Sequence, residues 1–311
     1  MRIGYPCINT TLGCRSNRTF RLKSYSRKRL TETIRSNLEC LAQILWFNAE
    51  HNISFFRITS DLIPFASHRV CDLNWQRHFR NQFQEIGNFM KKRGIRSCMH
   101  PGQYTILNSM KSSVVDSSVR ELRYHAQLLD LMELDSSAKI QIHVGGVYQN
   151  KAKSVKRFIE RVEMLEEQIK RRLVIENDER NYTFGDCLRI ATKTRVPMLL
   201  DIFHHTINCS GEPLQEALTL ITETWTKQDG LPMVDYSSQK TGCRKGKHAE
   251  TIDVTHFKKF LDASKPHDFD VMLEIKDKEK SAFKAIEIAS KDRRFKGVSW
   301  KYLLKSDKRL D

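Results

Sequence analysis

Eight short apolar runs, each followed by an amphipathic stretch, restrict the fold of this sequence more than any other feature. The runs are rich in β-branched and large apolar residues and predict β-strands. They span residues 2–8, 53–59, 95–99, 139–144, 173–177, 197–203, 233–237 and 269–275. The intervening stretches have the 3.6-residue period of a helix. They span residues 30–49, 75–93, 117–134, 155–171, 184–193, 213–226, 254–263 and 282–289.

The order of these segments predicts the fold class. A strand, a helix and a second strand in the same direction need a crossover connection, so repeated units of this kind build a parallel sheet. Eight such units close into a (β/α)8 TIM barrel, which takes ~250 residues or more. The chain has 311 residues and no Ser/Pro-rich linker. We therefore expect one domain over residues 1–311, with 290–311 as a basic helix or tail packed on the barrel.

Side chains that can carry chemistry follow the predicted strands at their carboxyl ends, where the active sites of such barrels lie. Six consecutive predicted strands end in His, Asp or Glu, and two more histidines lie on loops. The candidates are His68, His100, His143, Glu176, Asp201, His204, Asp235, His248 and Glu274. Taken singly, each is more often a structural polar residue. Several charges that converge on one barrel mouth, however, are costly to desolvate unless they are paired.

Divalent metal ions would compensate these charges. Mixed imidazole and carboxylate ligands suit zinc, manganese or iron(II). Nine candidates exceed what one ion can use, so we expect more than one. Clustered metals in basic surroundings favour the hydrolysis of phosphate esters, in which metals generate hydroxide and stabilise the attacking and leaving oxygens.

The charge of the chain favours a polyanionic partner, nucleic acid first. Lys and Arg number 53 against 37 Asp and Glu, which gives a formal net charge of +16. The alternative is that the charge only keeps the protein in solution. No run of 18 or more apolar residues is present, so the sequence predicts no membrane span. The N-terminus lacks the apolar region of a signal peptide.

The eight cysteines are scattered, without a CxxC pair. This spacing argues against a zinc knuckle and against the disulfide framework of a secreted protein. We expect reduced thiols in a cytoplasmic, nucleoid-associated protein.

Several longer motifs resemble the ultraviolet damage endonucleases. They are GYPCINTTLG (4–13), Phe47-Asn48, FRITSDLIPFASH (56–68), MHPGQY (99–104), ELRYHAQLL (121–129), HVGG (143–146), ENDER (176–180) and the segment 201–205. The resemblance runs from about residue 3 to about residue 280. It implies a barrel of the xylose isomerase and endonuclease IV type, with up to three divalent ions, commonly manganese. It also implies incision of double-stranded DNA immediately 5′ to cyclobutane pyrimidine dimers and 6-4 photoproducts, leaving a 3′-hydroxyl and a 5′-phosphate.

The resemblance also implies roles for individual residues. The metal ligands are His68, His100, His143, Glu176, Asp201, His204, His248 and Glu274, of which we expect His100, His143, Glu176 and Glu274 to be catalytic. Gln103 and Tyr104 fill the space that an extruded dinucleotide leaves, and extrusion costs less at damaged pairs. Tyr5 and Asn9 line the lesion pocket. The residues alone are equally consistent with an ordinary exposed turn at 103–104.

Two positions depart from the family pattern. Relatives place a lysine and a histidine ligand in the seventh strand, where this chain has Met233 and Asp235. Methionine is a poor ligand for hard ions, whereas aspartate can replace histidine. We therefore expect two firmly bound ions and a third site that is altered, weaker or empty. The basic segment 239–248 predicts phosphate contacts by Lys240, Arg244, Lys245 and Lys247, although a solvated loop is the alternative.

Three other functions remain open. An apurinic-site endonuclease would use the same type of metal site. A damage-binding protein with a degenerate site is consistent with Met233. A sugar isomerase has less support, because a basic surface does not help to bind a neutral sugar. We expect a monomer.

Overall fold

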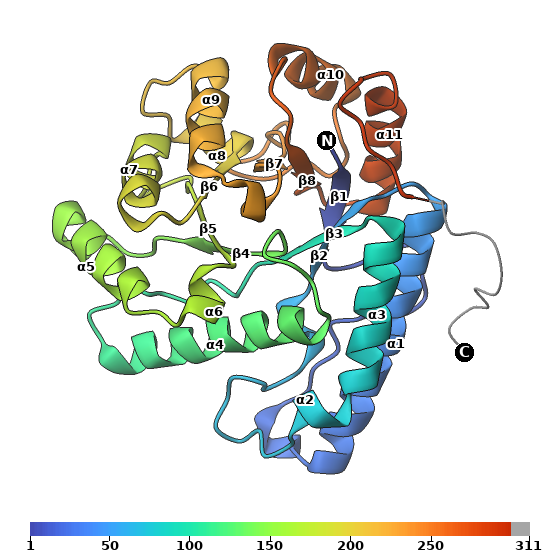
Figure 1. Ribbon diagram of the computed structural model, residues 1–311. Coiled ribbons are helices and arrows are strands. Elements are labelled where there is room, and N and C mark those ends of the chain that lie inside the picture. Colours follow the sequence, from blue (N-terminus) through green and yellow to red (C-terminus); the bar gives the residue numbers. More distant parts are fainter. Residues whose placement is uncertain (300–311) are drawn as a thin grey trace.

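The structure, a computed structural model, describes residues 1–299. Eight parallel strands form a closed barrel in sequence order, and helices surround it (Figure 1). The strands are β1 (Ile3–Pro6), β2 (Phe55–Ile58), β3 (Arg96–Met99), β4 (Lys139–His143), β5 (Leu173–Glu176), β6 (Met198–Asp201), β7 (Met233–Tyr236) and β8 (Asp270–Leu273). The predicted (β/α)8 barrel is therefore confirmed.

The helices lie close to the predicted segments. They are α1 (Arg27–Glu50), α2 (Trp75–His78), α3 (Arg80–Arg93), α4 (Ser112–Leu131), α5 (Lys151–Glu163), α6 (Glu167–Lys170), α7 (Phe184–Thr194), α8 (Ile202–Ile207), α9 (Leu214–Thr224), α10 (Val254–Ala263) and α11 (Glu279–Ala289). Three short 3-10 helices are η1 (Leu22–Ser24), η2 (Ser60–Leu62) and η3 (Lys227–Asp229). The predicted helices 75–93 and 155–171 are each divided in two.

The predicted strand 197–203 is too long at its carboxyl end. The strand ends at Asp201, and helix α8 begins at Ile202. The Asp201 carboxylate accepts a hydrogen bond from the His204 backbone N–H at 2.7 Å and so caps this helix. The apolar residues Ile202 and Phe203 continue the pattern of a strand, which is why periodicity alone missed the change.

The inside of the barrel is layered. Its apolar layer consists of Phe55, Cys98, Val174, Leu199, Met233 and Met272. Nearer the amino ends of the strands, Asp270 is bound by Arg96 and Arg2. Nearer the carboxyl ends, polar side chains replace the apolar ones. A larger apolar core lies between the barrel and the helices.

A disulfide joins Cys14 and Cys40, with their Cα atoms 5.7 Å apart. The expectation that all cysteines are reduced is therefore wrong for this pair. The long β1–α1 loop folds back onto helix α1 and brings together two cysteines that are 26 residues apart in sequence. Sequence spacing could not show this contact, because neither residue belongs to a short-range cysteine motif.

Residues 290–299 contain no helix and run along the barrel. The Lys296 N–H donates to the Met1 carbonyl at 2.7 Å, and the Ser299 N–H donates to the Arg93 carbonyl at 2.8 Å. The remainder of the predicted C-terminal segment, residues 300–311, lies outside the described residues. Within residues 1–299, no helix combines the length and the apolar character needed to cross a membrane.

Candidate metal centre

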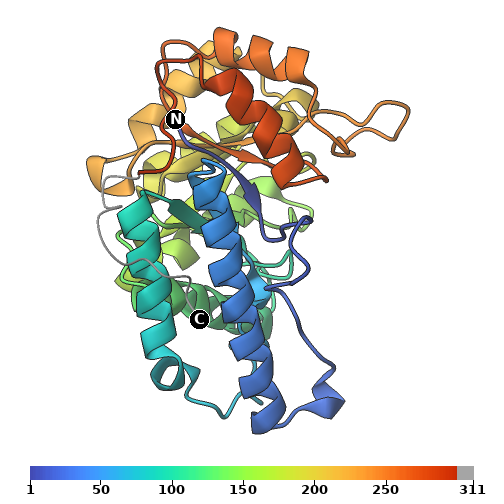
Figure 2. The same ribbon diagram turned by 90° about the vertical axis from the view of Figure 1, so that its right-hand side faces the viewer.

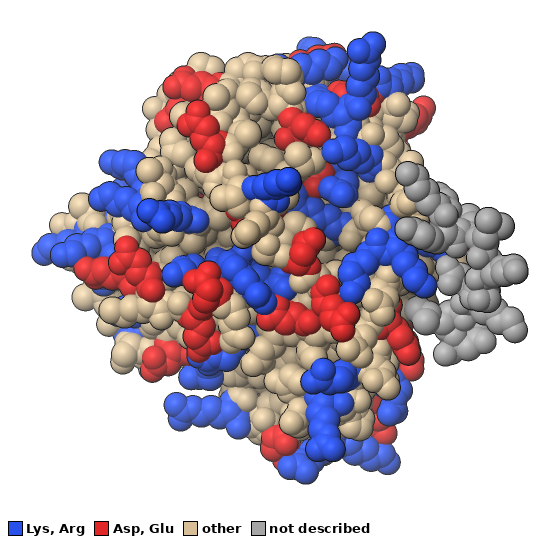
Figure 3. Space-filling model, viewed as in Figure 1, with Lys and Arg blue, Asp and Glu red and all other residues tan. Residues whose placement is uncertain are grey.

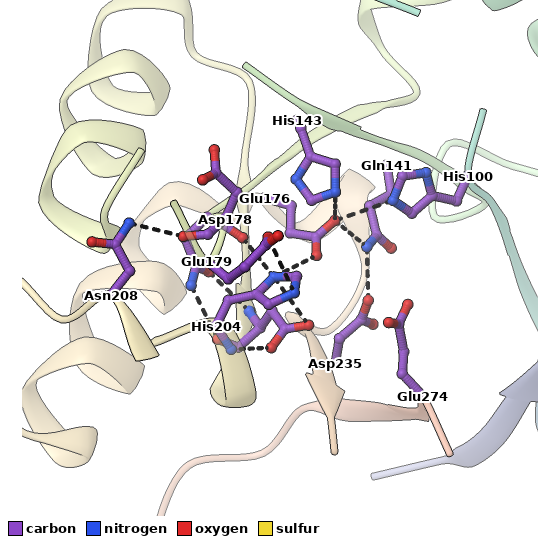
Figure 4. Close-up of polar contacts among 12 residues, drawn as sticks. His100, Gln141, His143, Glu176, Asp178, Glu179, His204, Asn208, Asp235 and Glu274 are labelled. Carbon is purple, nitrogen blue, oxygen red and sulfur yellow. Dashed lines mark hydrogen bonds and ion pairs between the residues drawn. The ribbon is translucent and has the colours of Figure 1, made fainter. Parts of the chain in front are cut away.

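Glu176 is the central carboxylate at the mouth of the barrel. It is the last residue of β5 and is 1% exposed. Its Oε2 lies 3.3 Å from His100 Nε2 and 3.4 Å from His143 Nε2. Its Oε1 lies 3.3 Å from His204 Nδ1. Residues from β5, α8 and the ends of β3 and β4 therefore converge on one carboxylate (Figure 4).

The mouth holds three groups of potential metal ligands, each with its ligand atoms within 4.8 Å of one another. They are His100, His143 and Glu176; Glu176, Asp201 and His204; and Asp201, Asp235 and Glu274. The first and second groups share Glu176, and the second and third share Asp201. A shared carboxylate can hold two cations side by side, so the donor set fits a cluster of divalent ions.

Three buried polar atoms in these groups have no hydrogen-bond partner: His143 Nδ1, Asp201 Oδ2 and Asp235 Oδ1. Buried polar atoms are nearly always paired, because an unpaired atom has lost water without compensation. Burial raises the pKa of Asp201 well above its usual range, and the neighbouring Glu176 carboxylate adds to this effect. A bound cation would satisfy the carboxylates and keep them ionised.

Backbone carbonyls orient two of the imidazole rings. His100 Nδ1 lies 2.9 Å from the Pro101 carbonyl, and His248 Nδ1 lies 2.9 Å from the Glu274 carbonyl. A ring that donates from Nδ1 leaves the Nε2 lone pair available to a metal, and such contacts are common around metal-binding histidines.

Arg57, from β2, lies between the carboxylates of the third group. Its Nη2 donates to Asp235 Oδ2 at 2.6 Å and to Gln141 Oε1 at 2.8 Å, and its Nη1 pairs with Glu274. Burial raises the pKa of Glu274, but Arg57 and His100 together outweigh burial and lower that pKa to about 2. The guanidinium therefore supplies positive charge within the third group.

Sequence reasoning missed Arg57 and Gln141. Gln141 Nε2 donates to Glu176 Oε2 at 2.5 Å and to Asp235 Oδ2 at 2.7 Å, so it connects the first group with the third. Both residues are buried within strands whose neighbouring residues are mostly apolar. A polar residue in the middle of such a strand is the signal that could have identified them.

Two predicted ligands lie outside the three groups. The His68 side chain is exposed, and its Nδ1 accepts a hydrogen bond from the Val70 N–H at 3.0 Å. His248 lies closer to the centre, with its Nδ1 3.9 Å from Glu274 Oε2. The structure thus brings seven of the nine predicted ligands together, places His248 at their edge and leaves His68 apart.

A cavity of about 430 Å³ opens beside the ligand groups. Its lining includes His100, Gly102, Gln103, His143, Gly145, Gly146, Arg180, His204 and His248. The loops after β3, β4, β5 and β7 therefore meet around one space. Extended polyanions could reach the ligands from this side.

The predicted lesion-contacting residues fall into two environments. Gln103 is exposed, and Tyr104 is 62% exposed. Tyr5 and Asn9 are buried, at 0% and 2% exposed. Tyr5 donates a hydrogen bond to Asn48 Oδ1 at 2.8 Å and accepts one from Asn9 at 2.9 Å. The first pair is accessible to a ligand, whereas the second pair is not.

The basic loop between β7 and α10 extends away from the barrel (Figure 2). Gln239 forms an isolated antiparallel bridge with His248. The Gln239 side chain donates to the Arg244 carbonyl at 3.0 Å and accepts from the Gly246 N–H at 2.9 Å. The loop is therefore an ordered structure attached beside a candidate ligand.

Two of its four predicted phosphate-contacting residues have partners within the protein. Lys240 pairs with Glu250 at 2.5 Å, and Lys245 donates to a backbone carbonyl of α8 at 3.0 Å. The side chains of Arg244 and Lys247 are exposed and form no hydrogen bond or ion pair within residues 1–299. These two are the better placed to meet a phosphate.

The sequence matches known proteins over nearly its whole length. The family model described as UV-endonuclease UvdE matches residues 1–301. The UV DNA damage endonuclease of Clostridium perfringens (strain 13 / Type A) is 39% identical over 290 residues, which is 92% of this chain and 70% of that protein. That of Bacillus cereus (strain G9842) is 33% identical over 309 residues, which is 96% of this chain and 98% of that protein.

The comparison with solved structures agrees with the comparison of sequences. The crystal structure of SacUVDE has a TM-score of 0.91 and 44% identity, covering 95% of this chain and 100% of that chain. Endonuclease IV from Thermus thermophilus has a TM-score of 0.54 and 14% identity, covering 80% of this chain and 93% of that chain. The second likeness shows the fold alone, and it confirms the predicted endonuclease IV type of barrel.

Proposed function

Because this chain belongs to the UV-endonuclease UvdE family, we propose that it is a metal-dependent endonuclease that cuts ultraviolet-damaged DNA. The incision lies immediately 5′ to cyclobutane pyrimidine dimers and 6-4 photoproducts and leaves a 3′-hydroxyl and a 5′-phosphate. The observation that carries the proposal is the convergence of three histidines on the buried Glu176 carboxylate at the mouth of a barrel.

Two divalent ions, manganese by preference, fit the first two ligand groups. His100, His143 and Glu176 would hold one, and Glu176, Asp201 and His204 the other. When bound, such ions supply a hydroxide at neutral pH and neutralise charge on the phosphate. His248 stands close enough to Glu274 to join the cluster, whereas His68 needs a movement of the β2–α2 loop.

A third ion is bound weakly or not at all. Arg57 already neutralises Asp235 and Glu274, two of the three carboxylates in the third group. Met233 lies in the apolar layer below, so it offers no hard ligand at this position. No lysine modification is expected at residue 233.

The protein's own residues orient the reacting groups. Glu176 fixes the relative positions of three imidazoles and would be a ligand in both candidate ion sites. Arg57 and Gln141 hold Asp235 and Glu274 in place. Preorganised charge of this kind stabilises the charge that develops on a phosphate in the transition state.

Gln103 and Tyr104 occupy the gap left by the extruded dinucleotide. Gln103 lines the cavity beside the ligand groups, and the exposed Tyr104 ring lies against Gly102, another lining residue. An aromatic ring can stack on an unpaired base, and an amide can form hydrogen bonds with its edge. Arg244 and Lys247 bind the backbone phosphates. Contact of Tyr5 or Asn9 with the lesion requires a movement of the β1–α1 loop, and their assignment rests on the family resemblance.

We further propose that the chain acts as a single-domain monomer in the cytoplasm, on the DNA of the nucleoid. The described part of the C-terminal segment, residues 290–299, packs on the barrel rather than on a second domain.

An incision assay tests the proposed function. Three end-labelled duplexes of one sequence carry a thymine dimer, an abasic site or no lesion, and each is incubated with manganese, zinc, magnesium or a chelator. Cutting 5′ to the dimer that requires a divalent ion supports the proposal. Cutting at the abasic site alone indicates an apurinic-site endonuclease. Binding to the dimer without cutting under any metal condition indicates a damage-binding protein.

A further inference from the structure

A second exposed tyrosine lies at the rim of the same cavity as Tyr104. Within residues 1–299, Tyr104 and Tyr148 are the two tyrosines with large exposed surfaces, at 62% and 38%. Each belongs to the loop that follows a candidate ligand, His100 or His143. Each also has an exposed glutamine beside it in sequence, at 103 or 149. Two neighbouring strands of the barrel thus present the same pair of residue types.

Each tyrosine ring covers a glycine that lines the cavity. A Cβ atom added to Gly102 would lie 2.4 Å from Tyr104 Cε1, and one added to Gly146 would lie 2.9 Å from Tyr148 Cζ. Both glycines line the cavity of about 430 Å³. The two rings therefore border one space and are supported by its walls in the same way.

Arg157 contacts one face of the Tyr148 ring and holds the ring in place. The Arg157 guanidinium lies 5.4 Å from its centroid. Arg157 donates to the Asn108 carbonyl at 3.1 Å, and Asn108 donates to the Gly146 carbonyl at 2.7 Å. This cation–π interaction on one face stabilises the orientation of the ring and leaves its exposed surface accessible.

The backbone of this loop is in an unfavourable conformation. Tyr148 and Gln149 have φ angles of 48° and 64°, so two consecutive residues with side chains occupy the left-handed region. Such strain tends to occur at binding and catalytic sites, where the surrounding structure enforces it. Here the strained segment carries an exposed aromatic ring.

We propose that Tyr148 is a second base-stacking residue, which binds an unpaired base of the damaged duplex next to the one bound by Tyr104. This inference rests on the proposed function. A pyrimidine dimer joins two adjacent nucleotides, so its extrusion leaves two bases without partners. One tyrosine ring covers one base, and stacking on aromatic rings is tolerant of base identity. Two rings on the loops after two neighbouring strands match a lesion of two nucleotides.

Binding measurements on Tyr148→Ala and Tyr148→Phe test the inference. The probe is a duplex with one thymine dimer, an uncleavable methylphosphonate at the incision position and 2-aminopurine opposite the dimer. We expect Tyr148→Ala to bind this duplex at least about fivefold more weakly and to give brighter 2-aminopurine fluorescence in the complex, because a stacking partner is lost. Tyr148→Phe keeps the ring and should behave as the unmodified protein does. Met164→Ala, which removes an 80% exposed side chain after α5, is the control.

Three results would overturn the inference. Equal affinity and fluorescence for Tyr148→Ala would show that the ring contacts no base. An equal loss in Tyr148→Phe would assign the effect to the hydroxyl group. A loss of metal or of thermal stability in Tyr148→Ala would indicate that the ring only supports the loop. If the unmodified protein does not prefer the dimer duplex over an undamaged one, the proposed function itself fails, and that result is visible before any variant is compared.

Discussion

Glu176 is the residue on which the candidate metal centre depends most. It is almost fully buried, and three imidazoles from different elements approach its two oxygens. Burial raises its pKa, but His143, His100 and His204 outweigh burial and lower that pKa well below its usual range. It is therefore ionised at neutral pH.

Replacing Glu176 with Gln should abolish most of the incision activity. Glutamine preserves the shape of the side chain but removes the charge that two candidate sites share. Loss of outer contacts to a metal site costs about 10–100-fold, so loss of a bridging ligand should cost on the order of 100-fold or more. Incision rate and metal content by mass spectrometry are measured together.

Glu179→Gln is the matched control. Glu179 is partly exposed and its Oε2 lies 3.8 Å from His204 Nε2. As an outer contact of one ligand, it should lose less activity than Glu176→Gln, within the range of about 10–100-fold, and should keep its metals. Glu176→Gln protein that retains its metals and its activity would contradict the assignment.

Arg57→Met should change both stability and metal stoichiometry. Without the guanidinium, Asp235 and Glu274 are left with uncompensated charge, and a broken buried pair costs about 3–5 kcal/mol. We expect the metal-free variant to unfold at lower urea concentration than the unmodified protein. In excess manganese it should bind one ion more per chain and recover stability.

Arg57→Lys retains the positive charge and should bind the same number of ions as the unmodified protein. Three tightly held ions in the unmodified protein would refute the idea that Arg57 replaces one of them. Titration with manganese, followed by ion counting after gel filtration, distinguishes these cases.

At the scale of elements, the strand-to-helix loops at the carboxyl ends of the strands carry the residues proposed to meet DNA. Gln239 fixes the shape of the β7–α10 loop through hydrogen bonds to its backbone. The HPGQY turn after β3 and the loop after β4 border the cavity. The rigid barrel thus sets the distance between loops that have little regular structure of their own.

Arg244→Ala and Lys247→Ala should each weaken DNA binding in a sequence-independent way. Each phosphate contact that is lost should reduce the slope of log K against log salt by about 1. Fluorescence anisotropy at several salt concentrations, with damaged and undamaged duplexes, measures this slope. Lys170→Ala is the control, because Lys170 lies just before the amino end of β5, at the opposite end of the barrel. An unchanged slope in both loop variants would exclude this loop from the DNA interface.

At the scale of the whole molecule, the basic residues behind the net charge of +16 are not spread as a continuous positive surface. Acidic side chains lie among the basic ones on the face shown in Figure 3. Net charge by itself therefore favours a polyanionic partner but does not identify the surface that binds it. The loops around the metal ligands provide that location in the proposal.

A buried ion cluster connects strands of the barrel near their amino ends. Asp270 Oδ2 lies 2.8 Å from Arg96 Nη1 and 3.1 Å from Arg2 Nη1, so one carboxylate ties β8 to β3 and to the residue before β1. Burial raises the pKa of Asp270, but the two arginines outweigh burial and lower that pKa below its usual value of 3.8.

Asp270→Asn should reduce the free energy of unfolding at neutral pH by about 3–5 kcal/mol, because it leaves two arginines without their carboxylate. The difference in the free energy of unfolding between the unmodified protein and Asp270→Asn is fully present above pH 3.8. It should shrink as the pH falls through the lowered pKa of Asp270. Urea unfolding from pH 7 downward measures the difference. Asp262→Asn, at an ion pair with Lys265 that is exposed on both sides, should leave the free energy of unfolding almost unchanged. A constant difference at all pH values would contradict the linkage.

The sequence by itself determined the order and approximate bounds of the strands and major helices, and hence the barrel. These features depend on the local spacing of apolar residues, to which every residue in a segment contributes. Seven predicted ligands also lie together, because the topology brings the carboxyl ends of all strands to one mouth. Only the tertiary structure decided that Arg57 neutralises Asp235 and Glu274, that Cys14 meets Cys40 and that His68 stands apart. Such contacts depend on strand register and on the paths of loops, for which neighbouring residues in the chain give no signal.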